Sequence, residues 1–299
     1  SSQYLAAIQN LGVDGYEYTL GAGGFDKDNV IRMSNRHILK NVSESIKIPV
    51  YRNGMISYAF EKDGQTISSG TTADFLESDE VDDQIVYISN IASNVDSFRD
   101  RVLLDGNSVF ESSECLKALE YEFTPFAVDS VNITYEDFTS ISGDNTKTEI
   151  IKIENITECK YEPTQVTFIN KFGAYQSLWF FKNSRRAMNV KSDNWNRRAN
   201  EYFVGYTNRR TTMKYNTQVQ EKITLNSGFY PENNNVVFEE LVQSDSVWLW
   251  TNPTDNTTVS QPIPVNVTST SFEFKNSRTD QMINYTMEFE YAIHKLKSL

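Results

Sequence analysis

The sequence predicts a mainly β protein, built from two or more β-sandwich-like domains with one or two short helices. Aromatic and β-branched residues, which favour strands, are spread along the chain, and aromatics alone make up 13% of it. Short runs of alternating polar and apolar residues recur, separated by turns that contain glycine or asparagine. The length of 299 residues suits about two domains, and the 39% hydrophobic content suits folded cores.

The first part of the chain shows strands separated by strong turn signals. Asn53-Gly54 is a typical hairpin turn, and we expect it to join the strands on either side of it. Asp63-Gly64 offers the next turn of the same kind. We therefore place a β-sandwich-like domain at residues 1–105. Its predicted strands are residues 46–51, 55–60 and 84–88.

The remainder, residues 106–299, is predicted to be a second β-rich domain. Residues 178–181 are four large apolar residues in a row, which suggests burial on both faces. We favour a central strand, and burial under a partner subunit is the alternative. Residues 236–242 place Val237, Phe238, Leu241 and Val242 on one face of a helix. The further predicted strands are residues 131–135, 149–153, 166–173, 246–250, 269–274 and 283–291, while residues 113–119 fit either a short helix or a strand.

Prolines argue against a central strand near the end of the chain. Pro262 and Pro264 alternate with Ile263 and Val265, so the spacing is that of a strand. Proline has no backbone N–H to donate to a sheet ladder, and it is normally confined to edge strands. We therefore expect residues 262–265 to lie outside the centre of any sheet.

The charges are unevenly distributed along an acidic chain whose formal net charge is -12. Residues 61–83 are rich in acidic residues and contain one basic residue, Lys62, whereas residues 182–214 are mainly basic. The acidic block of one copy could pair head to tail with the basic block of another. Alternatively, the two blocks form separate solvent-exposed faces that do not contact each other. An acidic surface also disfavours nucleic acid as a partner.

No catalytic or metal-binding pattern appears in the sequence. The P-loop, H-E-x-x-H and G-x-S-x-G motifs are missing, and His37 and His294 lie at opposite ends of the chain. The abundant carboxylates leave a glycosidase-type acid pair open, although no motif supports one. We therefore expect a non-enzymatic protein with no cofactor, no metal and no catalytic residues. We favour separate thiols at Cys115 and Cys159, but a disulfide between them also fits the cysteine count.

No membrane-spanning helix is predicted, because no run of about 18 apolar residues occurs. The expected contacts are instead with protein. The basic block interleaves arginines with aromatic residues, and Arg, Tyr and Trp are enriched at protein interfaces. Its candidate subunit-interface residues are Arg185, Arg186, Trp195, Arg197, Arg198, Tyr202, Arg209 and Arg210.

Several segments of the second half resemble virion structural proteins of tailed bacteriophages, especially phages that infect Bacteroidetes. The segments are residues 159–163, 166–174, 178–182, 223–229, 241–248, 264–267, 274–278 and 283–292. The resemblance covers roughly residues 155–299 and rests on strand and turn patterns, so it transfers no catalytic or binding residues. It implies a structural role in the phage particle, in the tail or baseplate rather than the capsid, after assembly in the bacterial cytoplasm.

The function expected from these observations is that of a tail or baseplate ring or adaptor protein. Such a protein would contact other copies of itself and neighbouring virion proteins. The alternative is a carbohydrate-binding or host-attachment module, in which Trp195, Tyr202 and Tyr206 stack on sugars.

Overall fold

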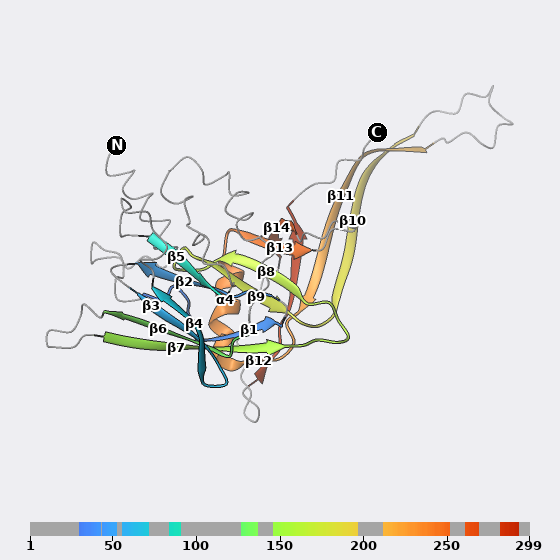
Figure 1. The fold of residues 1–299 in the computed structure, drawn as a ribbon. Helices are drawn as coiled ribbons and strands as arrows, with labels where there is room; N and C mark the ends of the chain where they lie inside the picture. The colour runs from blue at the N-terminus through green and yellow to red at the C-terminus, as the bar shows by residue number, and fades with distance from the viewer. Residues whose placement is uncertain are drawn as a thin grey trace, which may run out of the picture.

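The computed structural model describes residues 30–42, 44–52, 56–71, 84–90, 127–136, 146–196, 212–251, 261–268 and 282–292. This part of the chain is mainly β, which confirms the predicted fold class (Figure 1). The strands are β1 His37–Asn41, β2 Lys47–Arg52, β3 Ser57–Lys62, β4 Gln65–Thr71, β5 Gln84–Ser89, β6 Ser130–Glu136, β7 Thr146–Ile156, β8 Thr164–Ile169, β9 Tyr175–Phe180, β10 Ser184–Asn196, β11 Thr212–Asn226, β12 Tyr230–Pro231, β13 Val247–Thr251, β14 Gln261–Val267, β15 Met282–Ile283 and β16 Thr286–Tyr291. A 3-10 turn, η3 Glu232–Asn234, leads into the helix α4 Asn235–Gln243.

The larger sheet has seven strands in the order β10-β11-β16-β14-β13-β8-β9, and all its pairings are antiparallel. The helix α4 buries Val237, Phe238 and Leu241 in the core of this sheet. The Phe238 ring meets Phe180 edge to face, with the ring centroids 6.4 Å apart. The helix predicted at residues 236–242 is therefore confirmed, with one further residue at each end.

The smaller sheet has five strands in the order β1-β7-β6-β3-β4, and β1 runs parallel to β7. Its apolar face packs against residues of the separate β2–β5 ladder, which gives a second core of sandwich type. The sheet contributes Phe60 and Ile133, among others, to this core, and the β2–β5 ladder contributes Ile48 and Ile88. In β3 and β6 alternate residues therefore face inward, as the sequence pattern predicts.

The predicted domain boundary between residues 105 and 106 lies outside the described residues. Strands from both sides of it belong to the five-stranded sheet, because β3 pairs with β6. The predicted strand at residues 269–274 and the segment 113–119 also lie outside the described residues, as does Cys115. Cys159 is exposed.

The two predicted hairpin turns have different outcomes. Asp63 and Gly64 both adopt positive φ angles, and they join β3 to β4 as predicted. Asn53 and Gly54 lie outside the described residues, but the hairpin expected there is wrong, since β2 pairs with β5 and β3 pairs with β4 and β6. The physical reason is that β2 and β3 belong to opposite layers of one sandwich.

The position expected for Pro262 and Pro264 is also wrong, because β14 lies between β13 and β16 inside the seven-stranded sheet. Residues two apart in a strand direct their backbone N–H toward the same edge, so both missing donors fall on one side. β16 pairs with β14 only from Val265 onward. The prolines therefore precede the stretch of β14 that pairs with β16, although the Ala292 N–H, just after β16, donates to the carbonyl oxygen of Pro264 at 3.0 Å.

The prediction for residues 178–181 is correct in burial and wrong in position. Leu178, Trp179 and Phe180 are all buried, yet β9 is the last strand in its sheet and not a central one. Strands β1 and β2 lie against β9 and contribute to the burial of its side chains.

A series of hydrogen bonds between buried polar side chains connects the segment before β1 to the larger sheet and its helix. Asn170, in the turn after β8, donates through Nδ2 to the carbonyl oxygen of Arg32 at 2.7 Å and to Gln176 at 3.1 Å. Gln176 donates in turn to Asn35 at 3.1 Å, and Asn35 donates to Asn234 at 2.7 Å. These bonds link the segment before β1 to the β8–β9 turn and to the start of α4.

Candidate subunit interface

The longest pair of strands, β10 and β11, extends beyond the sheet to which it belongs. Their antiparallel register runs from Ser184 opposite Leu225 to Asn196 opposite Thr212. On its other side β11 pairs with β16 only from Lys222 to Asn226. The rest of the pair leaves the body as a ribbon that has just two strands among the described residues (Figure 1). We call β10 and β11 together the ribbon.

The sequence of the ribbon explains why it leaves the core. Ile223 and Leu225 are buried at its base, but toward the tip the alternating apolar residues are diluted by Asn, Gln, Lys and Arg. A bulge interrupts the pairing where Asn216 adopts a positive φ of 48°. The extra residue belongs to β11, and the Asn216 side chain donates to Asp193 at 3.0 Å.

The ribbon exposes large apolar side chains on both faces. Met188 and Val190 are 58% and 55% exposed, and they lie on the face that carries Ile223 and Leu225 nearer the body. Trp195 is 53% exposed and lies on the opposite face, across from Met213. Exposed apolar side chains that gather on one projecting element are typical of a surface that binds a partner.

The ribbon is basic although the protein as a whole is acidic. Its two strands carry five basic and two acidic residues, in a chain of net charge -12. The basic residues are Arg185, Arg186, Lys191, Lys214 and Lys222, and the acidic residues are Asp193 and Glu221.

Ion pairs hold the base of the ribbon on the body. Lys222 of β11 lies 3.0 Å from Glu288 and 3.9 Å from Glu290, both on β16. Lys182, just before β10, lies 2.5 Å from Glu158, and the hydrogen bond from Lys182 holds the pKa of that carboxyl below its ordinary value. The ribbon therefore starts from a fixed position on the sheet.

The structure describes three of the residues predicted for a subunit interface, namely Arg185, Arg186 and Trp195. All three are exposed on β10. The other five lie outside the described residues: Arg197, Arg198, Tyr202, Arg209 and Arg210. The sequence-based prediction did not include Met188, Val190 and Met213, whose regular alternation with polar residues was the available signal.

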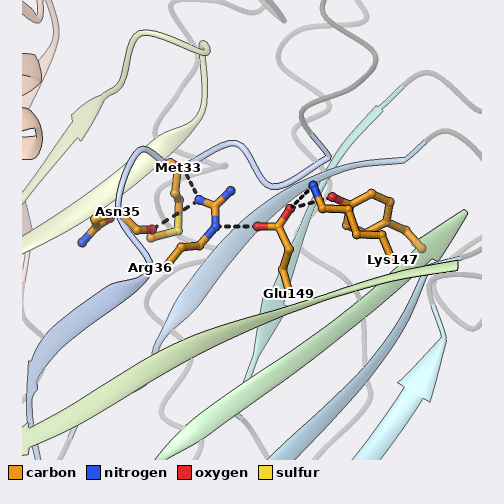
Figure 2. Close-up of polar contacts among 6 residues, drawn as sticks. Met33, Asn35, Arg36, Lys147 and Glu149 are labelled. Atoms are coloured by element: carbon orange, nitrogen blue, oxygen red, sulfur yellow. Dashed lines mark hydrogen bonds and ion pairs between the residues drawn. The ribbon is translucent and has the colours of Figure 1, made fainter. Parts of the chain in front are cut away.

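A second site is a cluster of polar and charged side chains around Glu149 of β7 (Figure 2). Arg36 Nε lies 2.7 Å from one carboxylate oxygen of Glu149, and Lys147 Nζ lies 3.2 Å from the other. The Tyr135 hydroxyl also donates to Glu149, at 2.6 Å. Arg36 donates to the carbonyl oxygens of Met33 and Asn35 as well, so the cluster ties the segment before β1 to β7.

The pKa shifts in this cluster have identifiable causes. Burial on its own would raise the pKa of Glu149, but hydrogen bonds from Tyr135 and Arg36 and the charge of Arg36 lower it below its ordinary value. Burial and the hydrogen bond to Glu149 raise the pKa of Tyr135. The pKa of Lys147 is raised as well, chiefly by its hydrogen bonds with Tyr135 and Glu149. The shifts of Glu149, Tyr135 and Lys147 each favour the ordinary charge state at neutral pH, which suits a structural link better than proton transfer.

Two further observations concern other kinds of site. Among the described residues, no group of three or more His, Cys, Asp and Glu side chains is placed to hold a metal ion. No helix in the described part of the chain is long and apolar enough to cross a membrane.

Comparisons with known proteins give no relative, since no protein-family model, curated protein or solved structure matches this chain.

Proposed function

We propose that this protein is a non-enzymatic structural subunit of a tailed-phage virion, and that the ribbon is the arm by which it holds a neighbouring subunit. The observation that carries the proposal is the ribbon itself. A two-stranded β ribbon in water is marginally stable without a third strand or a helix packed against it. This one nevertheless exposes Met188, Val190 and Trp195.

The location in the particle follows from the resemblance of residues 155–299 to tailed-phage virion proteins, which favours a tail or baseplate ring or adaptor. The ribbon supports this role, because assembly proteins need exposed contact elements on a stable body. Burial of its apolar side chains against a neighbour would supply binding energy, and its arginines would supply polar contacts at the rim.

The proposal is tested on purified phage particles and on the purified full-length chain. We expect mass spectrometry to find the protein in the particles, and single-particle imaging of the chain to show an oligomer. Absence from particles together with a strictly monomeric chain would overturn the proposal.

A matched pair of variants tests the role of the ribbon. Met188→Asp/Val190→Asp should abolish incorporation into particles while circular dichroism shows an intact fold, because both side chains are exposed. Ile150→Asp changes an equally exposed side chain on β7 and should be incorporated normally. Equal incorporation of both variants would exclude the ribbon as the contact arm.

A carbohydrate-binding role is the second candidate, and one arrangement favours it. Trp195 lies opposite Met213, and Tyr215 lies opposite Asp193, so the two aromatic side chains are diagonal neighbours on one face. Both are more than half exposed, as a platform for sugar rings requires. A glycan array on which the wild-type chain binds and Trp195→Ala does not, while Val190→Ala on the other face does, would favour this role.

A further inference from the structure

The outer edge of β10 is open along its whole described length. Among the described strands only β11 pairs with β10, which is the first strand of its sheet. The thirteen residues of β10 include no proline, and the bulge residue lies in β11. Proteins prevent edge strands from pairing by proline, bulges, short length or charged side chains. Of these four, β10 has only the charges, and it carries both signs: Arg185, Arg186 and Lys191 are basic and Asp193 is acidic.

The sequence of β10 is complementary to itself when it is read in the antiparallel direction. With Asn189 at the centre, Arg185 falls opposite Asp193, and Met188 falls opposite Val190. The other opposing pairs are Arg186 with Ser192 and Ala187 with Lys191. No like charges are directly opposite, and directly opposite ion pairs and apolar pairs stabilise antiparallel strands.

We propose that the partner of the ribbon is a second copy of this chain, and that the two β10 strands pair antiparallel about a twofold axis at Asn189. This inference rests on the proposed function and names the partner of the same arm. The seven-stranded sheets of the two copies would then continue into each other through β10. The twofold arrangement is also the commonest one among protein oligomers.

The side-chain rows across such a joint are consistent with this register. Asn189 lies opposite Gln220 within the ribbon, so the central row would hold four amides, two from each copy. Val190 lies opposite Val219, so each Met188 of one copy would extend an apolar row formed by two valines of the other. Each exposed apolar side chain of this face thereby gains an apolar neighbour.

The basic character of the ribbon offers a competing arrangement, in which it docks on an acidic surface of a neighbour. Two ribbons of the same sign repel at long range, but two Arg185–Asp193 pairs would form across the proposed joint. Short-range pairing of opposite charges outweighs long-range repulsion once salt screens the latter. The β10–β10 dimer is twofold symmetric and docking on an acidic surface is not, so experiments that report symmetry can distinguish the two arrangements.

The first experiment is disulfide crosslinking of the full-length chain in a Cys115→Ser/Cys159→Ser background. Residues directly opposite in an antiparallel pair have Cα atoms about 4.5–5.5 Å apart, which is within disulfide range. We expect Asn189→Cys to give a covalent dimer under mild oxidation. Ala187→Cys, which is equally exposed on the same face, should not, because its two copies would lie about 13 Å apart along the strands. Crosslinking of both variants alike, or of neither, would overturn the proposal.

The second experiment exchanges the charges. Arg185→Asp alone and Asp193→Arg alone should each weaken dimer formation about tenfold, as two favourable pairs become repulsive. The double variant Arg185→Asp/Asp193→Arg restores both pairs in a twofold dimer, so its dissociation constant should return to the wild-type value. Sedimentation equilibrium measures all four proteins, and a double variant as weak as the single variants contradicts the twofold register.

Failure of this inference is distinguishable from failure of the proposed function. A chain that is monomeric in solution but incorporated into particles through Met188 and Val190 would overturn the twofold dimer and leave the ribbon as the arm for a different subunit.

Discussion

Arg36 and Glu149 form an ion pair of 2.7 Å that joins the segment before β1 to the first part of β7. The two residues are separated by 113 positions in the sequence, so this pair closes a long loop of the chain. Lys147 and Tyr135 contact the same carboxylate. Glu149 therefore compensates the charges of Arg36 and Lys147 and connects them to Tyr135.

We expect Glu149→Gln to lower the free energy of unfolding by about 1–2 kcal/mol, because it weakens two partly exposed ion pairs and one hydrogen bond. Urea denaturation at neutral pH measures the change. Glu154→Gln serves as the control, since Glu154 is more exposed and, among the described residues, its one ion pair is with His37. Equal effects of the two substitutions would contradict the importance of the cluster.

The same carboxylate should make stability depend on pH in the acidic range. The pKa of Glu149 lies below its ordinary value of 4.5 in the folded protein. The unfolded chain therefore binds more protons between the two pKa values, so the contribution of Glu149 is complete above 4.5 and is lost as the pH falls toward the lowered pKa. The difference in stability between wild type and Glu149→Gln should shrink from about pH 6 to about pH 3. A constant difference would exclude this linkage.

Asn170 should be among the most sensitive polar residues in the protein. Its side chain is fully buried, and its Oδ1 accepts hydrogen bonds from the backbone N–H groups of Phe172 and Ala174, each at 3.0 Å. Asn170→Ala leaves several buried partners unsatisfied and should cost about 2–4 kcal/mol. Asn170→Asp should be comparably harmful, because it removes both amide donors. Thermal and urea denaturation measure both, and the exposed Asn183→Ala should change stability by less than about 0.5 kcal/mol.

Gly70 should not tolerate even one added methyl group. It lies opposite Tyr58 in the β3–β4 hairpin, and a Cβ atom at this position would fall 2.6 Å from the tyrosine hydroxyl oxygen and 2.8 Å from Cζ. We expect Gly70→Ala to destabilise the protein by about 1–3 kcal/mol through displacement of the buried ring. In a Tyr58→Leu background the same substitution should cost much less. A double-mutant cycle measures this coupling, and additive effects would show that the ring is not the obstacle.

Tyr230 links two elements of the larger core through its hydroxyl group. The side chain is buried, its hydroxyl donates to the carbonyl oxygen of Trp179 at 2.6 Å, and its ring packs edge to face on Phe238. Tyr230→Phe keeps the ring contact but removes the donor, so we expect a loss of about 1–2 kcal/mol. The half-buried Tyr161 gives the matched control, and Tyr161→Phe should be nearly neutral in the same denaturation experiment.

The types of the elements could be predicted from the sequence better than their partners could. Alternation identified β3 and β16, and the spacing of Val237, Phe238 and Leu241 identified α4, because both patterns follow from the geometry of one element. The pairing of β2 with β5 depends on how layers stack, and residues near Asn53 carry no information about that. The prolines of β14 were misleading because a strand can be interior over only part of its length.

For the ribbon, too, the composition could be interpreted from the sequence, whereas its arrangement in space could not. The basic and aromatic composition of the segment predicts a contact surface, and the structure places Arg185, Arg186 and Trp195 exposed on β10. Its projection beyond the sheet could not be predicted, since it depends on where β16 stops pairing with β11.

The parallel pairing of β1 with β7 has a consequence for synthesis of the chain on the ribosome. His37 pairs with Lys152, so β1 is synthesised long before its only sheet partner among the described strands exists. Leu39 of β1 also packs into the core of the larger sheet, whose strands are made later still. Contacts of such long sequence separation form slowly. During translation the nascent chain therefore carries β1 unpaired through much of its elongation, which makes this strand a natural binding segment for chaperones.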